Sequence, residues 1–305
     1  MIKPYNKLSD YIKERFGCRV FKVTVDGGFT CPNKDGTKSY GGCAYCASPA
    51  LLPKAYDGAD VTGQLDAGIR YVRGRHKADK FIAYFQINTN TYASLPQLCD
   101  LYATALNHPN VAGLAISTRP DAVDDDILEM LRRFKDEKFL WLELGLQSAN
   151  DKTLARINRR HTVADFERAC EAAMSKGIDV CAHVIIGLPG EDRQDYLATM
   201  RLLGRLGVWG VKFHQLQVLR GTALEQEYNK GRLPVLGLEE YAGFVVDCLE
   251  NAPESMVVHR LAGDSPLDFL LAPKWGANKF IVADTVIKTF QQRDTAQGAR
   301  FNKAG

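Results

Sequence analysis

The segment TCPNKDGTKSYGGCAYC, residues 30–46, contains three cysteines with the spacing C-x11-C-x2-C. No histidine or fourth cysteine lies close to Cys31, Cys43 and Cys46 in the sequence. A structural zinc site normally has four protein ligands, whereas an iron–sulfur cluster held by three thiolates leaves one iron free to bind another molecule. The segment therefore predicts a metal centre with an open coordination position.

The rest of the chain has the composition of a globular protein. It has 305 residues, of which 46% are hydrophobic and 25% charged, and a chain of this size can bury a large core. No apolar stretch has the length of a membrane span or an export signal, so we expect a cytoplasmic protein with no membrane partner and with reduced cysteines. Cys99, Cys170 and Cys248 fall on apolar faces of helical patterns, and we expect all three to be buried.

Strand-like and helix-like segments alternate along the chain. Six runs rich in β-branched and aromatic residues predict strands, at 19–25, 80–85, 112–117, 139–144, 178–186 and 210–218. Amphipathic segments between them predict helices, one of which starts at Thr162 and stops at Gly177. Successive β-then-α units imply a parallel sheet with right-handed crossovers, and no early Gly-x-Gly-x-x-Gly turn marks a dinucleotide-binding sheet. We therefore expect an α/β fold, a partial (β/α)6-type TIM barrel.

The chain is expected to divide into two parts. Residues 1–220 are assigned to the barrel, and residues 221–305 to a small C-terminal α/β extension that completes or covers it. One further strand is expected at 256–260, and the tail 295–305 is expected to fray.

Polar side chains follow the predicted strands, at the rim where parallel barrels place their functional loops. The stretches concerned are Gln86–Tyr92, Ser117–Asp121, Gln147–Ser148, Gly187–Glu191 and Gln215–Gln217. Any one of these stretches is a weak signal, but their shared position on one rim predicts a binding site.

Three predicted strands carry unusual polar residues inside them. Glu143 lies in an apolar run, and a buried carboxylate costs several kcal/mol unless it is paired. Its partner is either a structural cation or, as we favour, an amine or hydroxyl group of a ligand. Cys181 and His183 share one strand face, as do Lys212 and His214, so each pair is either part of the core or a substrate contact or proton donor in the barrel mouth.

Basic residues cluster in three places, although the net charge is only +3. The clusters are Arg70, Arg73, Arg75, Lys77 and Lys80; Arg132, Arg133 and Lys135; and Arg156, Arg159, Arg160 and His161. Each cluster is more often a solvated helix face, but together they are compatible with a polyanionic partner such as RNA.

Taken together, these motifs resemble the radical S-adenosylmethionine (SAM) superfamily. The closest resemblance is to the branch that contains the elongator catalytic subunit, and within it to short proteins of the YhcC/YtqA type. The matching text is Cys31–Asn33, Gly41–Cys46, Tyr84–Gln86, Thr89–Tyr92, Thr118–Asp121, Glu143–Ser148 and His183–Glu191. The resemblance is good from about residue 18 to 219.

The chain departs from the superfamily pattern at two points. The usual cysteine spacing is C-x3-C-x2-C, but a long first gap is itself a mark of the elongator-like branch. Phe85-Gln86-Ile87 stands where the superfamily has Gly-Gly-Glu, which leaves the contact to the SAM amino group open. The chain has no room for the acetyltransferase domain of the elongator subunit, so acetyl transfer is not expected.

The resemblance implies a cofactor pair and a set of contacts. Cys31, Cys43 and Cys46 would hold a [4Fe–4S] cluster, and SAM bound to its fourth iron would be cleaved to a 5′-deoxyadenosyl radical. Tyr45 would lie near the adenine, flanked by Ile185 and Leu216–Gln217. The candidates for the methionyl and ribose groups are Gln86, Glu143, Gln147 and Arg156.

The same resemblance implies a substrate and leaves alternatives open. It points to the wobble uridine of tRNA, with remodelling of a C5 substituent such as carboxymethylaminomethyl, in a tRNA-modifying transferase fed by a flavodoxin- or ferredoxin-type electron donor. A small metabolite or a peptide is the alternative substrate. The non-catalytic alternative is an iron–sulfur or zinc module that binds RNA or passes electrons.

Overall fold

A curled parallel sheet forms the centre of the molecule. The computed structural model describes residues 4–47 and 58–302. Seven parallel strands pair in the order β1-β2-β3-β4-β5-β6-β8. Their bounds are β1 Val20–Val25, β2 Lys80–Phe85, β3 Val111–Thr118, β4 Phe139–Gln147, β5 Asp179–Ile186, β6 Gly210–Gln215 and β8 Val257–Arg260. The expected partial (β/α) barrel with a C-terminal extension is confirmed, and the further strand near 256–260 adds to the same sheet.

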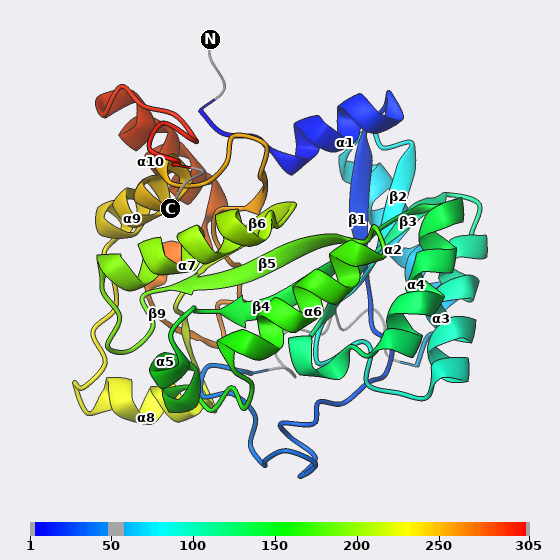
Figure 1. Cartoon of the computed structure of the whole chain (residues 1–305), viewed down its shortest axis with the longest axis horizontal. Coiled ribbons are helices and arrows are strands. Elements are labelled where there is room, and N and C mark those ends of the chain that lie inside the picture. The colour runs from blue at the N-terminus through cyan, green and yellow to red at the C-terminus, as the bar shows by residue number, and fades with distance from the viewer. Residues whose placement is uncertain (1–3, 48–57, 303–305) are drawn as a thin grey trace.

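Helices cover the convex side of this sheet (Figure 1). They are α2 Val61–Arg75, α3 Leu95–Asn107, α4 Asp125–Glu137, α6 Val163–Ser175, α7 Arg193–Leu206, α9 Leu238–Glu250 and α10 Lys279–Gln292. Capping boxes start α3 at Ser94, α6 at Thr162 and α7 at Asp192, which satisfies amide groups that a helix start leaves unpaired. The predicted start of α6 at Thr162 is therefore confirmed.

Shorter elements close the two ends of the barrel. α1 Leu8–Phe16 packs against both edge strands, β1 and β8. α5 Asp151–Arg156 and α8 Ala223–Asn229 lie beside the cysteine-bearing loop, seen at the bottom of Figure 1. β7 Val218–Leu219 and β9 Leu270–Ala272 form a separate antiparallel pair, and two short 3-10 turns span Pro120–Ala122 and Lys274–Ala277.

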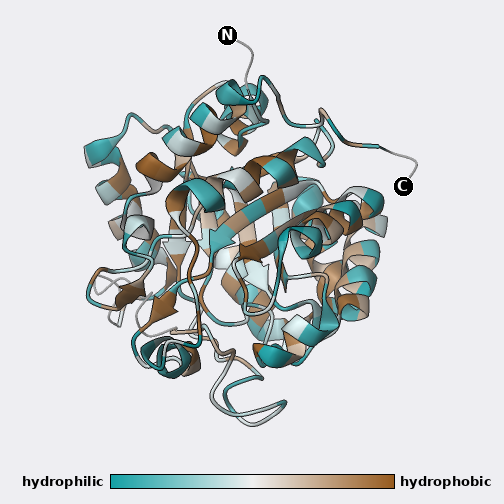
Figure 2. Cartoon of the chain, turned by 90° about the vertical axis from the view of Figure 1, so that its left-hand side faces the viewer, coloured by the Kyte–Doolittle hydropathy of each residue, from teal (hydrophilic) through white to brown (hydrophobic). Residues whose placement is uncertain are grey.

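Strand alternation separates an apolar layer from a polar interior. On β2, Phe81, Ala83 and Phe85 join the large core under the helices, whereas Ile82 and Tyr84 face the barrel interior. The same period of two places Glu143 and Lys212 inside the barrel. Figure 2 shows the result, with hydrophobic residues on the strands and hydrophilic ones on the outer helix faces.

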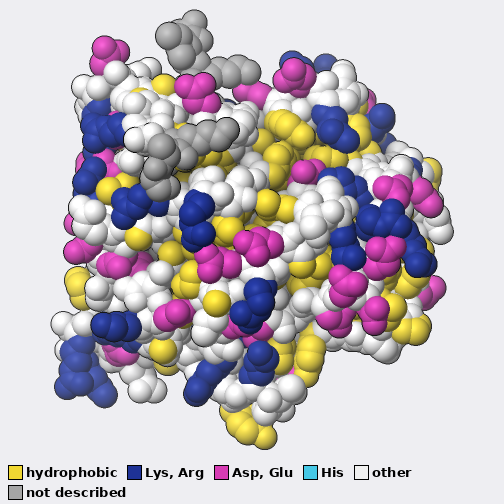
Figure 3. All heavy atoms as spheres, viewed as in Figure 1, with side chains coloured by type: hydrophobic (Ala, Val, Ile, Leu, Met, Phe, Trp, Pro, Cys, Tyr) yellow, Lys and Arg dark blue, Asp and Glu magenta, His cyan; other side chains and the backbone are white. Residues whose placement is uncertain are grey.

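Charges of both signs are mixed on the helical surface (Figure 3). Arg132 on α4 is paired with Glu129 at 2.8 Å and with Asp136 at 2.9 Å. Lys135 pairs with Asp179 at 3.2 Å. The basic cluster at 132–135 is thus largely neutralised by neighbouring acids. No helix in the described ranges is long and apolar enough to cross a membrane.

Three expectations about individual segments were wrong. The run 210–218 is not one strand, because β6 ends at Gln215 and the chain turns before Val218 pairs with β9. Cys99 is exposed on the outer face of α3, although Cys170 and Cys248 are buried as predicted. The tail is packed at Gln297 and Arg300, because the buried Gln297 side chain donates to the carbonyls of Pro253 and Met256 at 2.7 and 2.8 Å and the Arg300 amide donates to the carbonyl of Glu250 at 2.8 Å. Residues 303–305 lie outside the described residues.

Candidate active site

The long gap between the first two cysteines folds into a compact loop organised by Asn33. Asn33 is fully buried, and its side chain donates to the carbonyl of Asn158 at 2.6 Å. Its amide oxygen accepts from Ser39 Oγ at 2.8 Å, and its backbone carbonyl accepts from Gly42 N at 2.8 Å. Eleven residues are therefore folded back on themselves, which brings Cys43 next to Asn33.

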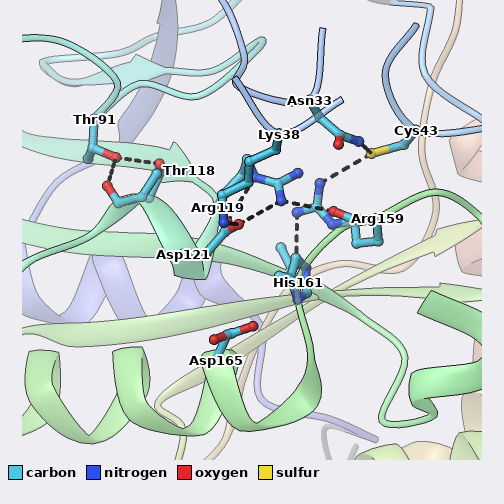
Figure 4. Close-up of polar contacts among 12 residues, drawn as sticks. Asn33, Lys38, Cys43, Thr91, Thr118, Arg119, Asp121, Arg159, His161 and Asp165 are labelled. Carbon is cyan, nitrogen blue, oxygen red and sulfur yellow. Dashed lines mark hydrogen bonds and ion pairs between the residues drawn. The ribbon is translucent and has the colours of Figure 1, made fainter. Parts of the chain in front are cut away.

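A chain of charged contacts leads from this loop to Cys43 (Figure 4). Lys38 Nζ lies 2.5 Å from Asp121, which also binds Arg119 through two contacts of 2.8 and 2.9 Å. Arg119 donates to the backbone carbonyl of Arg159 at 2.8 Å, and Arg159 Nη1 lies 3.5 Å from Cys43 Sγ. Residues of three separate motifs are thus joined beside one cysteine.

These contacts favour the thiolate form of Cys43. Burial opposes ionisation, but the Arg159 guanidinium, helped by Arg119 and Asn33, holds the pKa of Cys43 below its ordinary value. Burial likewise opposes ionisation of Asp121, and Arg119 and Lys38 still lower its pKa to about 2. A thiolate is the form of cysteine that binds metals.

Arg159 is held in place by the end of β4. Its Nη2 donates to the carbonyl of Gly145 at 2.9 Å, and His161 Nε2 lies 3.1 Å from the same oxygen. A Cβ atom at Gly145 would come within 2.4 Å of Arg159 Nη2, so glycine is required here by the close approach of the guanidinium. Burial and the nearby Arg159 lower the pKa of His161 to about 3, so this ring is neutral.

Cys31, Cys43 and Cys46 line one cavity of about 130 Å³ together with Arg119, Arg159 and Thr89. Arg119 Nη1, Arg159 Nε and Thr89 Oγ1 are buried without a hydrogen-bond partner among the described residues. Buried polar groups of this kind need an explanation, and sulfide or thiolate acceptors in the cavity would supply one. The side chains therefore fit a cluster with negatively charged sulfur atoms.

Cys31, Cys43 and Cys46 around one cavity fit an iron–sulfur cluster, because in such a cluster each thiolate binds a different iron.

A second, larger cavity of about 900 Å³ continues from Tyr45 and Cys46 into the barrel. Five of the predicted cofactor contacts line it: Tyr45, Gln86, Gln147, Ile185 and Gln217. The structure brings these residues together from the cysteine loop, from β4 and β5, and from the segments that follow β2 and β6. Gln147 and His183 also line the smaller cavity, so the two spaces adjoin.

Left-handed backbone conformations occur where these cavities meet the strand ends. Ile87 and Asn88 follow β2 with φ values of 75° and 60°, and Gln147 ends β4 with a φ of 74°. Such conformations are costly for residues other than glycine, most of all for a β-branched one. Strain of this kind is concentrated at functional sites.

Glu143 does not line either cavity, and the partner favoured for it from the sequence is wrong. It is fully buried, and Oε2 lies 2.7 Å from Lys212 Nζ, 2.7 Å from Tyr84 OH and 2.8 Å from His183 Nε2. Oε1 accepts from Lys22 at 3.3 Å and from the Trp141 indole at 3.2 Å. Of the two partners considered for Glu143, the structure therefore shows the structural cation. Burial opposes ionisation, but Lys212 and Lys22 hold the pKa of Glu143 well below its usual value.

Lys212 and His183 contact Glu143 and also line the larger cavity. Burial lowers the pKa of Lys212 to about 7, although Glu143 opposes that shift. Burial, aided by Lys212, lowers the pKa of His183 to about 3. Three members of the predicted pairs on β5 and β6, His183, Lys212 and His214, line the cavity and are available to contact a bound molecule.

Arg156 lies outside both cavities. It is about half exposed and pairs with Glu227 at 3.5 Å. In contrast, Arg159 and His161 are buried beneath the cysteine loop. The cluster of basic residues at 156–161 is therefore not one solvated face, because only Arg156 and Arg160 remain accessible.

Comparison with known families agrees with this geometry. The family profile described as the Radical SAM superfamily matches residues 36–203, and the Radical_SAM C-terminal domain matches residues 208–292. The chain belongs to the radical SAM superfamily. A [4Fe–4S] cluster and SAM are the cofactors of that superfamily.

Two relatives cover nearly the whole chain, and a third covers part of it. YtqA of Bacillus subtilis is 38% identical over 303 residues, covering 99% of this chain and 94% of its own. YhcC of Escherichia coli is 37% identical over 279 residues, covering 91% and 89%. A tRNA uridine(34) acetyltransferase of Dehalococcoides mccartyi is 28% identical over 211 residues, covering 68% of this chain and 44% of its own.

Two solved structures share the fold. Archaeal Elp3 of Methanocaldococcus infernus has a TM-score of 0.68 at 18% identity, covering 91% of this chain and 64% of its own. SuiB of Streptococcus suis, in complex with SAM, has a TM-score of 0.52 at 10% identity, covering 84% and 53%. At these identities the likeness shows a shared fold.

Sequence reasoning missed several residues of this radical SAM site. Arg159 was grouped with surface arginines, and no role was predicted for Asn33 or Arg260. Asn33 directly follows Cys31-Pro32 and had a visible signal, since a polar residue next to a ligand often supports it. Arg159 had none, because its burial depends on contacts with residues more than a hundred positions away.

Proposed function

We propose that this radical SAM protein is an enzyme whose cluster is held by Cys31, Cys43 and Cys46. The observation that carries the proposal is the cavity lined by these three cysteines and by the buried, incompletely paired Arg159 and Arg119. When bound, the cofactors supply a 5′-deoxyadenosyl radical from SAM by one-electron reduction.

The larger cavity would receive SAM next to the cysteines. Tyr45, Ile185 and Gln217 would surround the adenine, and Gln86 and Gln147 would bind the polar end of the molecule. Tyr45 packs with Leu216 and Ile185 in one apolar cluster, which favours a flat aromatic group at that place. Glu143 and Arg156 drop out of this set, because neither lines the cavity.

The substrate that we propose is the wobble uridine of tRNA, with reaction at its C5 substituent. The support is the tRNA uridine(34) acetyltransferase relative, which aligns with 68% of this chain. Exposed arginines near the cysteine loop would contact RNA phosphates. A flavodoxin or ferredoxin in the cytoplasm would deliver the electron.

The proposal is tested by anaerobic reconstitution with iron and sulfide, followed by dithionite and SAM. Chromatography should show 5′-deoxyadenosine from the wild-type protein and none from Cys43→Ala, which should keep its helical circular dichroism. Cys99→Ala, at an exposed cysteine on α3, is the matched control and should retain cleavage. Cleavage by Cys43→Ala would refute the cluster assignment.

The substrate is tested separately. Nucleosides from the tRNA of a strain that lacks the gene should differ from wild type in one modified wobble uridine, and the purified enzyme should correct this tRNA. If bulk tRNA neither changes nor stimulates SAM cleavage, a small metabolite or peptide becomes the better substrate. A module that only binds RNA would bind tRNA without any cleavage of SAM.

A further inference from the structure

The end of the larger cavity that lies away from the cysteines is built from three basic side chains. Lys212, His214 and Arg260 line the larger cavity but not the cavity that contains all three cysteines. Lys212 and His214 come from β6, and Arg260 comes from the end of the neighbouring strand β8. The radical chemistry proposed above needs a substrate at this end, because the cysteine end would be filled by the cluster and SAM.

Hydrogen-bond donors at this end are not fully used. Lys212 has three N–H donors, of which two are directed to Glu143 at 2.7 Å and Tyr84 at 2.5 Å. Arg260 places Nη2 2.7 Å from His214 Nδ1, and its Nε is buried without a partner among the described residues. Leaving such a donor unpaired in a buried place is unfavourable, so a bound acceptor would be favoured here.

The neighbouring segment holds Arg260 in its position. Gln215 donates to the carbonyl of Gly263 at 3.0 Å and accepts from Gly263 N at 2.8 Å. A Cβ atom at Gly263 would lie 3.3 Å from Arg260 Nη2 and 3.1 Å from His214 Nδ1. The guanidinium is therefore enclosed on one side by backbone, while its buried Nε has no hydrogen-bond partner among the described residues.

The charges around this end favour an anion. Lys22 and Arg260 are cationic, Lys212 is partly so, and the buried Glu143 supplies one negative charge beneath them. Burial lowers the pKa of His183 to about 3 and that of His214 well below its ordinary value, so both rings are neutral. Asp264, at the exposed rim of the cavity, is the acidic residue on the other side.

Two donors of different shape select the type of anion. The Nε edge of an arginine presents parallel N–H groups that match the two oxygens of a carboxylate. Lys212 can add one more bond. A phosphate group would bring at least one further charged oxygen to a buried floor that has few free donors, at a desolvation cost.

We propose that Arg260 and Lys212 form a carboxylate-binding subsite, which holds the negatively charged end of the substrate next to the radical. For an RNA substrate the inference rests on the proposed function, and the carboxylate would belong to the C5 substituent of the wobble uridine. The subsite also sets specificity, since a neutral analogue would leave Arg260 Nε unpaired.

The first experiment tests the subsite with small anions. Isothermal titration calorimetry would measure binding of acetate and, separately, inorganic phosphate to the cluster-loaded protein saturated with SAM. Acetate should bind the wild-type protein and bind Arg260→Gln about tenfold more weakly or worse. Arg260→Lys keeps the charge but not the paired donors, so its affinity for acetate should lie between those of the wild type and Arg260→Gln. Arg168→Gln, on the exposed outer face of α6, should behave as wild type.

The second experiment tests the substrate. Fluorescence anisotropy would compare anticodon stem–loop RNAs that carry 5-carboxymethyluridine or its methyl ester, which differ by one negative charge. The wild-type protein should prefer the acid about tenfold, and Arg260→Gln should bind the two RNAs alike. Cluster absorbance and thermal melting would establish that each variant is folded and loaded.

The outcomes separate the two proposals. Absence of acetate binding, equal acetate binding by wild type and Arg260→Gln, or tighter binding of phosphate than acetate would each overturn the carboxylate subsite. Acetate binding that depends on Arg260, without binding of either RNA, would retain the subsite and refute the RNA substrate. RNA binding without preference for the acid would retain the proposed function and overturn the subsite.

Discussion

Arg159 Nη1 lies 3.5 Å from Cys43 Sγ, and the same guanidinium donates to the carbonyl of Gly145 at 2.9 Å. One side chain therefore connects the cysteine loop to the end of the central strand β4. Because reduction potentials of iron–sulfur clusters respond to nearby charge and to hydrogen bonds on sulfur, Arg159 is placed to support both the position and the potential of a cluster.

Gly145→Ala should disturb this connection without removing any polar group. The new Cβ would lie 2.4 Å from Arg159 Nη2 and 2.6 Å from Gln147 Nε2, so the guanidinium must move. We expect a loss of about 1–3 kcal/mol in the free energy of unfolding, with less iron retained after reconstitution. Denaturant melts and iron assays measure the two effects.

The matched control is Gly74→Ala, in the exposed last turn of α2, where a Cβ would meet nothing within 4 Å. Alanine there should stabilise the helix by about 0.5–1 kcal/mol and leave iron retention unchanged. Equal iron retention by Gly145→Ala and Gly74→Ala would show that iron retention does not depend on the present position of Arg159.

Glu143→Gln, in the barrel interior, should lower the free energy of unfolding more than the loss of a surface ion pair does. It removes the negative charge that faces Lys212 at 2.7 Å and Lys22 at 3.3 Å. Breaking a buried pair on one side typically costs about 3–5 kcal/mol, because the other charge stays buried. The free energy of unfolding at neutral pH should fall by this amount.

Glu167→Gln provides the comparison for a surface pair. Glu167 on α6 contacts Arg205 at 2.7 Å, but both side chains are partly exposed. Its loss should cost no more than about 1 kcal/mol. If the two substitutions cost the same, the interior network contributes no more than a surface ion pair.

Lys212 should make stability depend on pH in the alkaline range. Burial lowers its folded-state pKa to about 7, below the unfolded value of about 10.4. Between these values the unfolded chain binds more protons at this position, so the contribution of Lys212 to the free energy of unfolding rises with pH. Below pH 7 its unfavourable contribution is present in full.

The measurement is the difference in free energy of unfolding between wild type and Lys212→Met at several pH values. Tyr84 and Cys181 have raised pKa values through burial and act in the opposite direction, but they titrate in both proteins. The free energy of unfolding of the wild type should rise relative to that of Lys212→Met by up to about 1.4 kcal/mol per pH unit. Lys176→Met, at the end of α6, should show no such rise between pH 7 and 10, because the contacts with Asp125 and Glu129 raise the pKa of Lys176 instead. A flat difference for Lys212 would contradict its lowered pKa.

The barrel and the polar rim could be predicted from the sequence because both are local patterns. Alternation within strands such as β2 and β4 indicates which side chains face inward, and parallel order gathers the strand ends. Gln86, Gln147 and Gln217 could be located by this reasoning alone. The cysteine spacing added the prediction of a metal centre with an open coordination position.

The remaining residues depend on contacts between distant segments. Arg159 is buried because Asn33 and Ala44 bind the backbone carbonyls of Asn158 and Ile157 at 2.6 and 2.9 Å. Its position in a run of basic residues gives no sign of this. Likewise, only the structure shows that Gln297 anchors the C-terminal segment and that Lys212, rather than a ligand, neutralises Glu143.

The proposed contact with RNA is better tested at Arg156 and Arg160 than at Arg159. Arg160 is exposed and follows Asn158, which binds the carbonyl of Gly42 at 2.8 Å in the cysteine loop. Arg156→Gln combined with Arg160→Gln should weaken binding of bulk tRNA and lower its salt dependence by about one unit of slope per arginine. Cleavage of SAM without substrate should persist, because neither residue lines the cavities.

Arg132→Gln with Arg133→Gln, on α4 among acidic neighbours, removes the same charge elsewhere and should leave tRNA affinity unchanged. Equal losses from the two pairs would indicate a general charge effect, and loss of SAM cleavage would return Arg156 to the cofactor site.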